Sequence, residues 1–317
     1  MRATDVPLPA LLLRAAALSP LKHPAPGPAT QAPLTATRTP DPRHLAVYQK
    51  VCGFPTDDDT DTDTGTGTGT GTGGPLPLTY PHVLAFPLAM RLMTAPAFPL
   101  PLLGLVHTSI ELIRHHPLHH TQELELTVQA ERFVPHRRGT EAVLRTEATT
   151  KDGTLLWEST STYLARHTTK TTPPPHTPTP APTPTEPLQQ PDAVEEWTLP
   201  PDLGRRYATV SGDRNPIHLH PLTARPFGFP RAIAHGMWTA ARCLAQITRA
   251  GRTDESKQDE KEPTYALVEF RSPVLLPATV TYTRRGPTFT LHGPHGPHGA
   301  QARTHLIGRT KPSAALP

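Results

Sequence analysis

The sequence predicts an α+β fold in which a helix and antiparallel strands occur in each of two units. Helical apolar spacing appears twice along the chain, and alternating polar and apolar residues follow it each time. With 317 residues, of which 36% are hydrophobic, the chain is long enough to build two small cores. The apolar residues concentrate in 78–166 and 194–309, so we expect two domains of similar size.

Two tracts poor in apolar residues set the predicted domain boundaries. Residues 56–74 combine an Asp-Thr run with a Gly-Thr repeat, a composition that predicts a flexible loop. Residues 171–191 are rich in Pro and Thr, which predicts an extended linker. The predicted domains are therefore residues 1–170 and 192–317, joined by that linker.

The first unit is expected to begin with a helix over Tyr80–Met93 that is kinked or broken at Pro87. Strands should follow it, with Asp152-Gly153 as the turn of a hairpin between the last two. The segments with alternating character are 123–130, 141–149 and 155–166.

The second unit repeats this order of elements. Residues 233–250 carry apolar side chains at helical spacing. The short strands predicted after them are 265–270, 274–282, 288–291 and 302–307. The repeated order of helix and sheet suggests an internal duplication.

Composition excludes several classes of function. The formal net charge of +4 is compatible with anionic ligands such as coenzyme A or an acidic carrier protein. The arginines are dispersed and no zinc-finger spacing occurs, so we expect no nucleic-acid partner. No apolar run reaches the roughly 18 residues of a membrane span.

The expected location is the cytoplasm. Cys52 and Cys243 are the only cysteines, too few for a disulfide framework. The stretch Leu8–Leu13 briefly resembles a signal peptide, but Arg14 interrupts it early and Asp5 stands where positive charge is expected.

The segment Tyr207–His218 is the strongest indication of chemistry. It places Asp213 and His218 around two turn-forming pairs, Ser-Gly-Asp and Asn-Pro, so both side chains can point into one volume. A neutral imidazole accepts and donates protons near pH 7, and a carboxylate can orient it or hold a water. The pair suits addition or removal of water, with Ser211 and Asn215 fixing the turn.

Gly236 lies where the second predicted helix begins. The first turn of a helix has backbone N–H groups without intrahelical partners, and they carry a partial positive charge. A substrate oxygen can approach such a backbone closely at a glycine, so we expect Gly236 to stabilise a developing oxyanion.

No metal site is predicted. Two groups of histidines are dense, but no carboxylate or cysteine completes a ligand set at a recognised spacing. The groups are His115, His116, His119 and His120, and His292, His295 and His298.

The motif residues carry a resemblance to a known family. Tyr207–His218, the run Phe227–Trp238 and the later Phe270–Val280 closely resemble the MaoC-like dehydratases, or (R)-specific enoyl-CoA hydratases. Leu78–Leu88 and Leu103–His107 resemble the degenerate first repeat of two-repeat members.

This resemblance implies a double hot-dog fold, with two antiparallel sheets that each wrap a central helix. It implies that Asp213 and His218 add water to C3 of a trans-2-enoyl thioester and move the C2 proton. It further implies that Gly236 binds the thioester oxygen, with Ser211 and Asn215 in support. The first unit lacks the motif and is expected to shape the pocket without performing chemistry.

No cofactor is expected beyond the coenzyme A or acyl-carrier phosphopantetheine that belongs to the substrate. Arg214 and Arg231 are candidate contacts for its phosphates. The protein is expected to be a monomer, since two repeats already form a pseudo-dimer, or a homodimer. Fatty acid, storage polymer and polyketide metabolism all stay open as pathways.

Two other functions compete with dehydration. A thioesterase on the same fold would attack C1, which requires a nucleophile or base aimed at the carbonyl. A non-catalytic acyl-thioester-binding subunit is the second alternative, although such a module has no need of both Asp213 and His218.

Overall fold

A computed structural model describes residue 22 and residues 27–56, 74–102, 104–168, 190–253, 263–294 and 302–311. The elements of the first half are β1 (Gly27–Pro28), β2 (Leu34–Arg38), α2 (Pro42–Cys52), α3 (Tyr80–Thr94), β3 (Leu105–Arg114), β4 (Leu124–His136), β5 (Gly139–Thr149) and β6 (Leu155–Arg166). Those of the second half are β7 (Ala193–Leu199), α4 (Leu203–Ser211), α5 (Pro216–Leu219), α6 (Pro221–Ala224), η3 (Arg225–Phe227), α7 (Gly236–Thr253), β8 (Tyr265–Phe270), β9 (Ala278–Arg285), β10 (Thr288–His292) and β11 (Thr304–Lys311).

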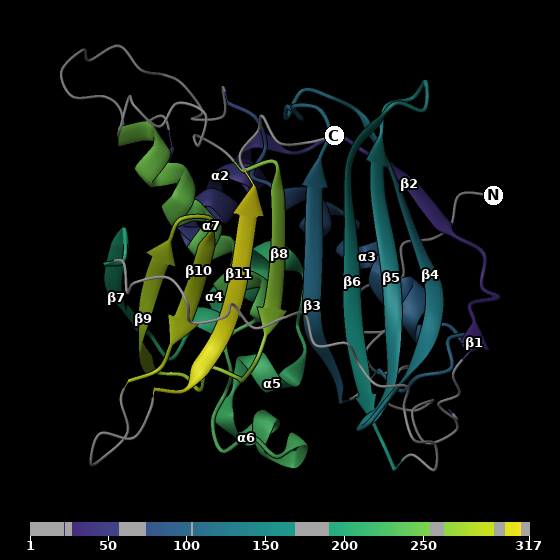
Figure 1. Cartoon of the computed structure of the whole chain (residues 1–317). Helices are drawn as coiled ribbons and strands as arrows, with labels where there is room; N and C mark the ends of the chain where they lie inside the picture. The colour runs from purple at the N-terminus through teal and green to yellow at the C-terminus, as the bar shows by residue number, and fades with distance from the viewer. Residues whose placement is uncertain are drawn as a thin grey trace.

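The strands form one antiparallel sheet that runs through both halves (Figure 1). Its order is β1-β4-β5-β6-β3-β8-β11-β10-β9-β7, and β2 also pairs with β4. The two halves meet where β3 pairs with β8, in a register that aligns Ser109 with Glu269 and Ile113 with Tyr265. The α+β fold with antiparallel strands is thereby confirmed, and the two predicted sheets are continuous.

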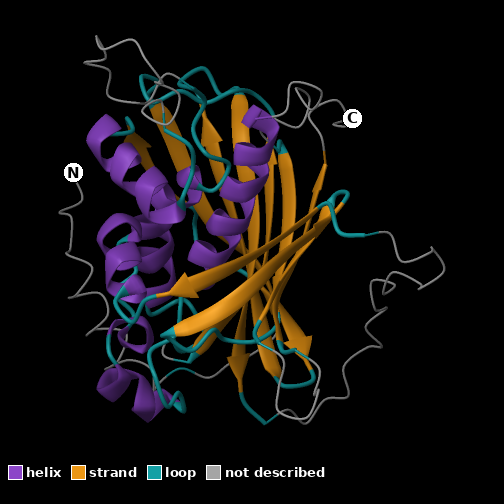
Figure 2. Cartoon of the chain, turned by 90° about the vertical axis from the view of Figure 1, so that its left-hand side faces the viewer, coloured by secondary structure: helices purple, strands orange, loops and turns teal. Residues whose placement is uncertain are grey.

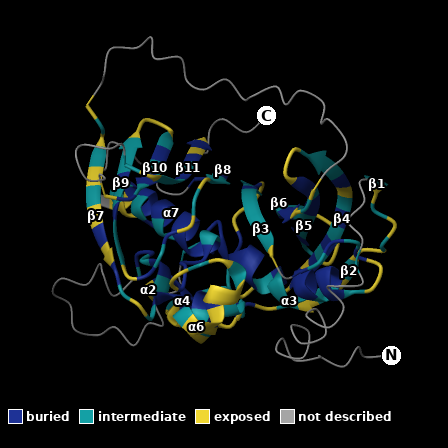
Figure 3. Cartoon of the chain, turned by 90° about the horizontal axis from the view of Figure 1, so that it is seen from below, coloured by how far each residue is buried: buried dark blue, intermediate teal, exposed yellow. Residues whose placement is uncertain are grey.

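The helices lie on one face of this sheet (Figure 2), and the core fills the space between the layers. Figure 3 shows α3 and α7, largely buried, beneath the curved sheet. Helix α7 buries Trp238, Leu244 and Ile247 among others, and α3 buries Leu88 and Leu92. Both helices are central because apolar side chains surround most of each one.

Helix α2 comes from the first half but packs against helices of the second half. The indole nitrogen of Trp238 in α7 donates to the carbonyl of Val51 at 2.9 Å. The rings of Tyr48 and Tyr207 lie 6.4 Å apart, which joins α2 to α4. The helical layer, like the sheet, is therefore continuous across the two halves.

Helix α3 continues through Pro87, so of the two predicted alternatives, a kinked or a broken helix, the structure excludes the broken one. Proline removes one backbone hydrogen bond and crowds the preceding turn. The burial of this helix on nearly all sides offsets that loss, since most helical stability in proteins comes from tertiary packing. The prediction of a broken helix was wrong on this point.

Several predicted features lie outside the described residues. They are most of the loop 56–74, nearly all of the linker 171–191, and His295 and His298. The domain boundaries derived from those tracts stay predictions. No helix in the described part of the chain is long and apolar enough to cross a membrane.

Candidate active site

The turn that carries Asp213 forms because helix α4 stops at Ser211. Gly212 follows in the left-handed conformation, with φ 72°, and its amide donates to the carbonyl of Ala208 at 3.1 Å. Glycine adopts this helix-ending conformation without steric cost. Asn215 then caps the short helix α5, so the predicted turn lies between two helices that the sequence did not predict.

Hydrogen bonds between residues close in the sequence fix the Asp213 loop. The Ser211 hydroxyl donates to the Tyr207 carbonyl at 3.0 Å and accepts from the Asp213 amide at 3.1 Å. One carboxylate oxygen of Asp213, Oδ1, accepts from the Asn215 amide at 3.1 Å, and Asn215 Oδ1 accepts from the Ile217 amide at 3.3 Å. Ser211 and Asn215 therefore hold the loop, and Oδ2 of Asp213 stays directed at two histidines.

His218 lies on α5 with its side chain almost fully buried. Its Nδ1 lies 2.8 Å from the Ile233 carbonyl, and because a carbonyl only accepts, Nδ1 carries the hydrogen. Burial lowers the pKa of His218, although the Asp213 charge and the Ile233 carbonyl oppose that shift. The ring is neutral near pH 7, so Nε2 presents a free lone pair.

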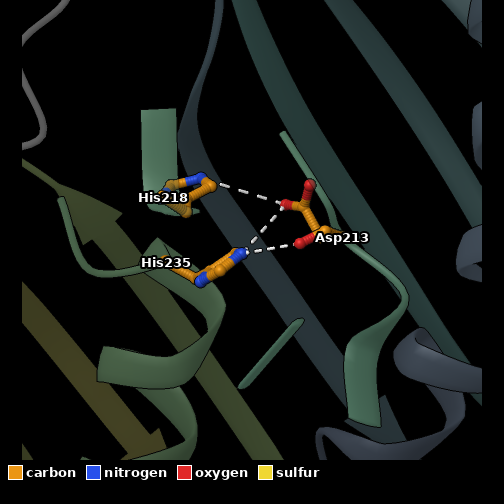
Figure 4. Close-up of side chains that lie close together, drawn as sticks. All are labelled: Asp213, His218 and His235. Carbon is orange, nitrogen blue, oxygen red and sulfur yellow. Dashed lines mark hydrogen bonds and ion pairs between the residues drawn. The ribbon is translucent and has the colours of Figure 1, made fainter. Parts of the chain in front are cut away.

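This lone pair faces Asp213 (Figure 4). His218 Nε2 lies 4.0 Å from Asp213 Oδ2, too far for a direct hydrogen bond. An oxygen atom about 2.8 Å from each group can bridge them. The side chain of Asp213 is 27% exposed, so a substrate can reach it. The arrangement can bind a water or hydroxyl between a carboxylate and a neutral imidazole.

His235 is a third member of the site, and the sequence analysis did not include it among the candidate residues. Its Nε2 donates to the backbone carbonyl of Asp213 at 3.0 Å and lies 3.8 Å from Oδ2. Its ring stacks on His218 with centroids 3.7 Å apart. Burial and the neighbouring His218 lower the pKa of His235 to about 3. Its position next to Gly236 was the one sequence signal available.

Gly236 is the first residue of α7, as the sequence predicted. A methyl group built on it would lie 3.1 Å from Cε1 of Phe270, so a larger residue would press on that ring. The backbone here is half-buried and lies one residue from His235. Its amide lies in the first turn of α7, where backbone N–H groups have no carbonyl partner within the helix.

Gly204 supports the site in a way that the sequence did not reveal. A methyl group at this position of α4 would lie 1.9 Å from the carbonyl oxygen of His218. Helices α4 and α5 therefore approach each other more closely than any other residue type permits. Nothing in the local sequence around Gly204 indicates such a contact, because it depends on how two helices pack.

The two arginines that are candidates for phosphate contact lie on the surface. Arg214 is exposed beside Asp213, and Arg231 is exposed and donates to the Pro277 carbonyl at 3.2 Å. A groove with a volume of about 360 Å³, here called the α3–α4 groove, lies near the Asp213 loop. Tyr80 and Val83 line one side, and Ser211 lines the other.

Asp213, His218 and His235 together could hold a metal ion, since one ligand atom from each lies within 4.8 Å of the others. His235 Nε2 is already committed as a donor to the Asp213 carbonyl, so it would have to break that hydrogen bond to coordinate. The two groups that fit without rearrangement are the Asp213 carboxylate and His218 Nε2. This donor set suits proton transfer better than metal binding.

Comparisons with known proteins bear on this geometry. Residues 182–284 match the MaoC like domain family. The 3-hydroxyacyl-thioester dehydratase X of Mycobacterium tuberculosis is 37% identical over 208 residues, which cover 64% of this chain and 68% of that protein.

Solved structures show the same architecture. A crystal structure of HtdX from M. tuberculosis matches with a TM-score of 0.64 at 29% identity, covering 89% of this chain and 100% of that one. A MaoC-like dehydratase from Phytophthora capsici matches with 0.64 at 19% identity, covering 91% and 98%. An M. tuberculosis protein described as having a double hotdog fold matches with a TM-score of 0.53 at 14% identity, covering 88% of this chain and 94% of that one. The last two likenesses concern the fold alone, and the predicted double hot-dog fold is confirmed.

Proposed function

Because the chain belongs to the MaoC-like dehydratase family and is a hydro-lyase, we propose that it reversibly dehydrates a (3R)-hydroxyacyl thioester to the trans-2-enoyl thioester. The observation that carries this proposal is the pairing of a neutral His218 with the Asp213 carboxylate across 4.0 Å. An oxygen bound between them meets one proton acceptor on each side. Such a pair can take up a proton from water as the water oxygen bonds to C3, and can return that proton in the reverse reaction.

In the hydration direction, His218 Nε2 accepts a proton from the water while the water oxygen bonds to C3. Asp213 Oδ2 accepts a hydrogen bond from the other hydrogen of that water. The electrons of the double bond move toward the thioester, which gives an enolate-like oxygen at C1. The proton on His218 then passes to C2, so the atoms of one water are added and the side chains return to their starting state.

The Gly236 amide is the proposed donor to the enolate-like oxygen. A fixed backbone donor of this kind typically lowers the barrier by about 3–4 kcal/mol. Ser211, Asn215 and His235 hold the Asp213 loop in the geometry that the reaction needs. None of these steps uses a redox or metal cofactor.

The thioester is proposed to enter through the α3–α4 groove, where Val83, Leu84 and Pro87 of α3 give the first-half wall an apolar stretch. The carrier is coenzyme A or the phosphopantetheine of an acyl carrier protein, with Arg214 and Arg231 near enough to the surface to contact its phosphates. Cys52 and Cys243 are both free and buried, which agrees with a cytoplasmic location.

Hydration of crotonyl-CoA tests the proposal directly. The wild-type protein should remove the enoyl absorbance and give the (3R)-hydroxy product on chiral analysis. Asp213→Asn and His218→Ala should each lower the rate by about a hundredfold or more. His116→Ala, at an exposed histidine away from the site, serves as the control and should keep the full rate.

The same assay distinguishes the rival functions. Release of free coenzyme A without loss of the double bond would indicate a thioesterase. Binding without turnover of coenzyme A or carrier-protein thioesters would indicate a non-catalytic subunit.

A further inference from the structure

A second pair of imidazoles, one buried and one half-buried, lies in the first half, which was expected to contribute no chemistry. His82 is in the first turn of α3 and His107 is on β3. Their rings are nearly parallel, at 14°, with centroids 6.2 Å apart. Both histidines belong to the half of the protein that lacks the Asp213 motif, and the proposed reaction uses neither of them.

This pair faces the site. The charge of Asp213 acts on His82 and on Tyr163, so both lie within its electrostatic reach. His107 stacks on Tyr163 with centroids 4.4 Å apart and contacts Phe270 at 5.0 Å. Phe270 in turn lies against the backbone of Gly236. The two imidazoles therefore lie close to the site, with His82 within reach of the Asp213 charge and His107 against the ring that packs on Gly236.

Both rings have a nitrogen that lacks a hydrogen-bond partner within the described protein. These atoms are Nδ1 of His82 and Nε2 of His107, and both are buried. Leaving a buried polar atom unpaired costs free energy, and native structures rarely do so. A wall that served only an alkyl chain would gain nothing from two such atoms.

The protonation of His107 defines what it can bind. A hydrogen bond with the Ser109 backbone raises the pKa of His107, so the backbone group is the carbonyl and the ring donates to it. Nε2 is the nitrogen without a partner, so this donor is Nδ1. Burial keeps His107 neutral, with a pKa of about 3, and burial lowers the pKa of His82 to about 4. Nε2 of His107 is consequently a bare acceptor and requires a donor from the ligand.

A hydroxyl group meets this requirement, because it donates one hydrogen bond and accepts others. A ketone or ether oxygen only accepts, so it cannot satisfy His107 Nε2. The hydroxyl at C3 is already bound by Asp213 and His218 in the proposed reaction. The donor for His107 must then be a different group.

We propose that His82 and His107 form a subsite for a second hydroxyl group, so that the preferred substrate is a 3-hydroxyacyl thioester with a further hydroxyl on its acyl chain. His107 Nε2 accepts a hydrogen bond from the hydroxyl group. Nδ1 of His82, in the neutral tautomer that carries its hydrogen on this nitrogen, donates a hydrogen bond to the same oxygen. The inference rests on the proposed function, since it concerns the substrate of that reaction. It makes the first half a determinant of specificity.

The test compares trans-2-octenoyl-CoA with its 5-hydroxy, 6-hydroxy and 7-hydroxy derivatives in the hydration assay. At least one hydroxylated substrate should have a kcat/KM about tenfold higher than the plain chain with the wild-type protein. His107→Phe keeps a ring to stack on Tyr163 and Phe270 but removes the acceptor, so it should abolish this preference, with the kcat/KM of the hydroxylated substrate falling to that of the plain chain. His82→Phe should act in the same direction.

His120→Phe is the matched control. His120 is another first-half histidine with a buried nitrogen that lacks a partner, in the segment between β3 and β4. The preference of this variant should equal that of the wild type. Thermal denaturation of each variant checks that it is folded.

Two results would overturn the subsite. One is a wild-type protein that hydrates the plain chain at least as well as every hydroxylated one, a result that needs no variant. The other is an equal loss on all substrates in folded His82→Phe and His107→Phe, which would assign the pair a structural role. Failure of the wild type to hydrate any of the four substrates would instead overturn the proposed function.

Discussion

The imidazole rings of His218 and His235 stack face to face, with centroids 3.7 Å apart and an interplanar angle of 23°. Each ring uses one nitrogen to donate to a backbone carbonyl, Ile233 for His218 and Asp213 for His235. Two stacked imidazoles at this distance cannot both carry a charge in a buried site. Burial lowers the pKa of both rings, so both are neutral near pH 7, and the nitrogen with a free lone pair that faces Asp213 Oδ2 at 4.0 Å is Nε2 of His218.

The pH dependence of hydration should report the titration of His218. Its pKa is lowered from the ordinary 6.5 because burial disfavours the charged ring. The neutral ring is the base, so activity is present above the pKa and is lost as the pH falls through it. We expect kcat/KM for crotonyl-CoA to be level between about pH 6.5 and 8 and to decline only below that range. An acid limb centred above pH 6.5 would contradict this assignment.

Asp213→Asn should move the titration of His218 to lower pH. The carboxylate raises the pKa of His218, so its replacement by a neutral amide removes that support while burial continues to act. Nitrogen chemical shifts of ¹⁵N-labelled histidine, followed through an acid titration, measure this directly and do not depend on activity. A His218 pKa that stays the same in the variant would show that the two side chains do not interact.

His235→Phe should lower kcat by about tenfold and leave KM nearly unchanged. The phenyl ring can keep the stack on His218 but cannot donate to the Asp213 carbonyl, a hydrogen bond worth about 0.5–1.5 kcal/mol. The Asp213 loop then loses one of the hydrogen bonds that hold its backbone beside His218. Steady-state kinetics on crotonyl-CoA supply the measurement. A large rise in KM with kcat intact would instead place His235 in substrate binding.

Gly236→Pro should remove the proposed oxyanion donor while helix α7 persists. Proline has no amide hydrogen and is well tolerated at the first helical position. The expected loss in kcat is about 10²- to 10³-fold. Gly236→Ala is the control, because it also presses on Phe270 but retains the amide. Equal losses in the two variants would attribute the effect to crowding.

Gly204→Ala should destabilise the protein and disturb the site together. The added methyl group would lie 1.9 Å from the His218 carbonyl oxygen, so α4 and α5 must move apart. Overpacking of this kind costs about 1–3 kcal/mol. Gly74→Ala is a suitable comparison, since its methyl group would make an ordinary 3.7 Å contact with Arg252. Gly204→Ala should be less stable than Gly74→Ala in chemical denaturation and less active than Gly74→Ala on crotonyl-CoA.

The sequence predicted the parts of the site that depend on local chemistry. Ser-Gly-Asp and Asn-Pro are turn-forming pairs, and the structure has a left-handed Gly212 and an Asn215 cap at those positions. The alternation in 155–166 gave the bounds of β6 correctly. These features were predictable because each is decided by a few adjacent residues.

Other elements were missed because their stability comes from contacts distant in the sequence. Helix α2 has a proline in its first turn and the cap Asp41, which were usable signals, but α4 is only nine residues long and carries two arginines. Strand β3 gains its partners from β6 and β8, far along the chain. The ring contact of His107 with Phe270 crosses the pairing of β3 with β8, so no local pattern could indicate it.

The pairing of β3 with β8 has a consequence for how the enzyme behaves at low concentration. Where two separate chains build such a sheet, each site exists only while the chains are associated, and it disappears on sufficient dilution. Here the peptide chain itself tethers the two halves, so their effective concentration is set by the tether and not by the amount of protein. Activity per molecule should consequently hold constant down to the lowest enzyme concentration that an assay can detect.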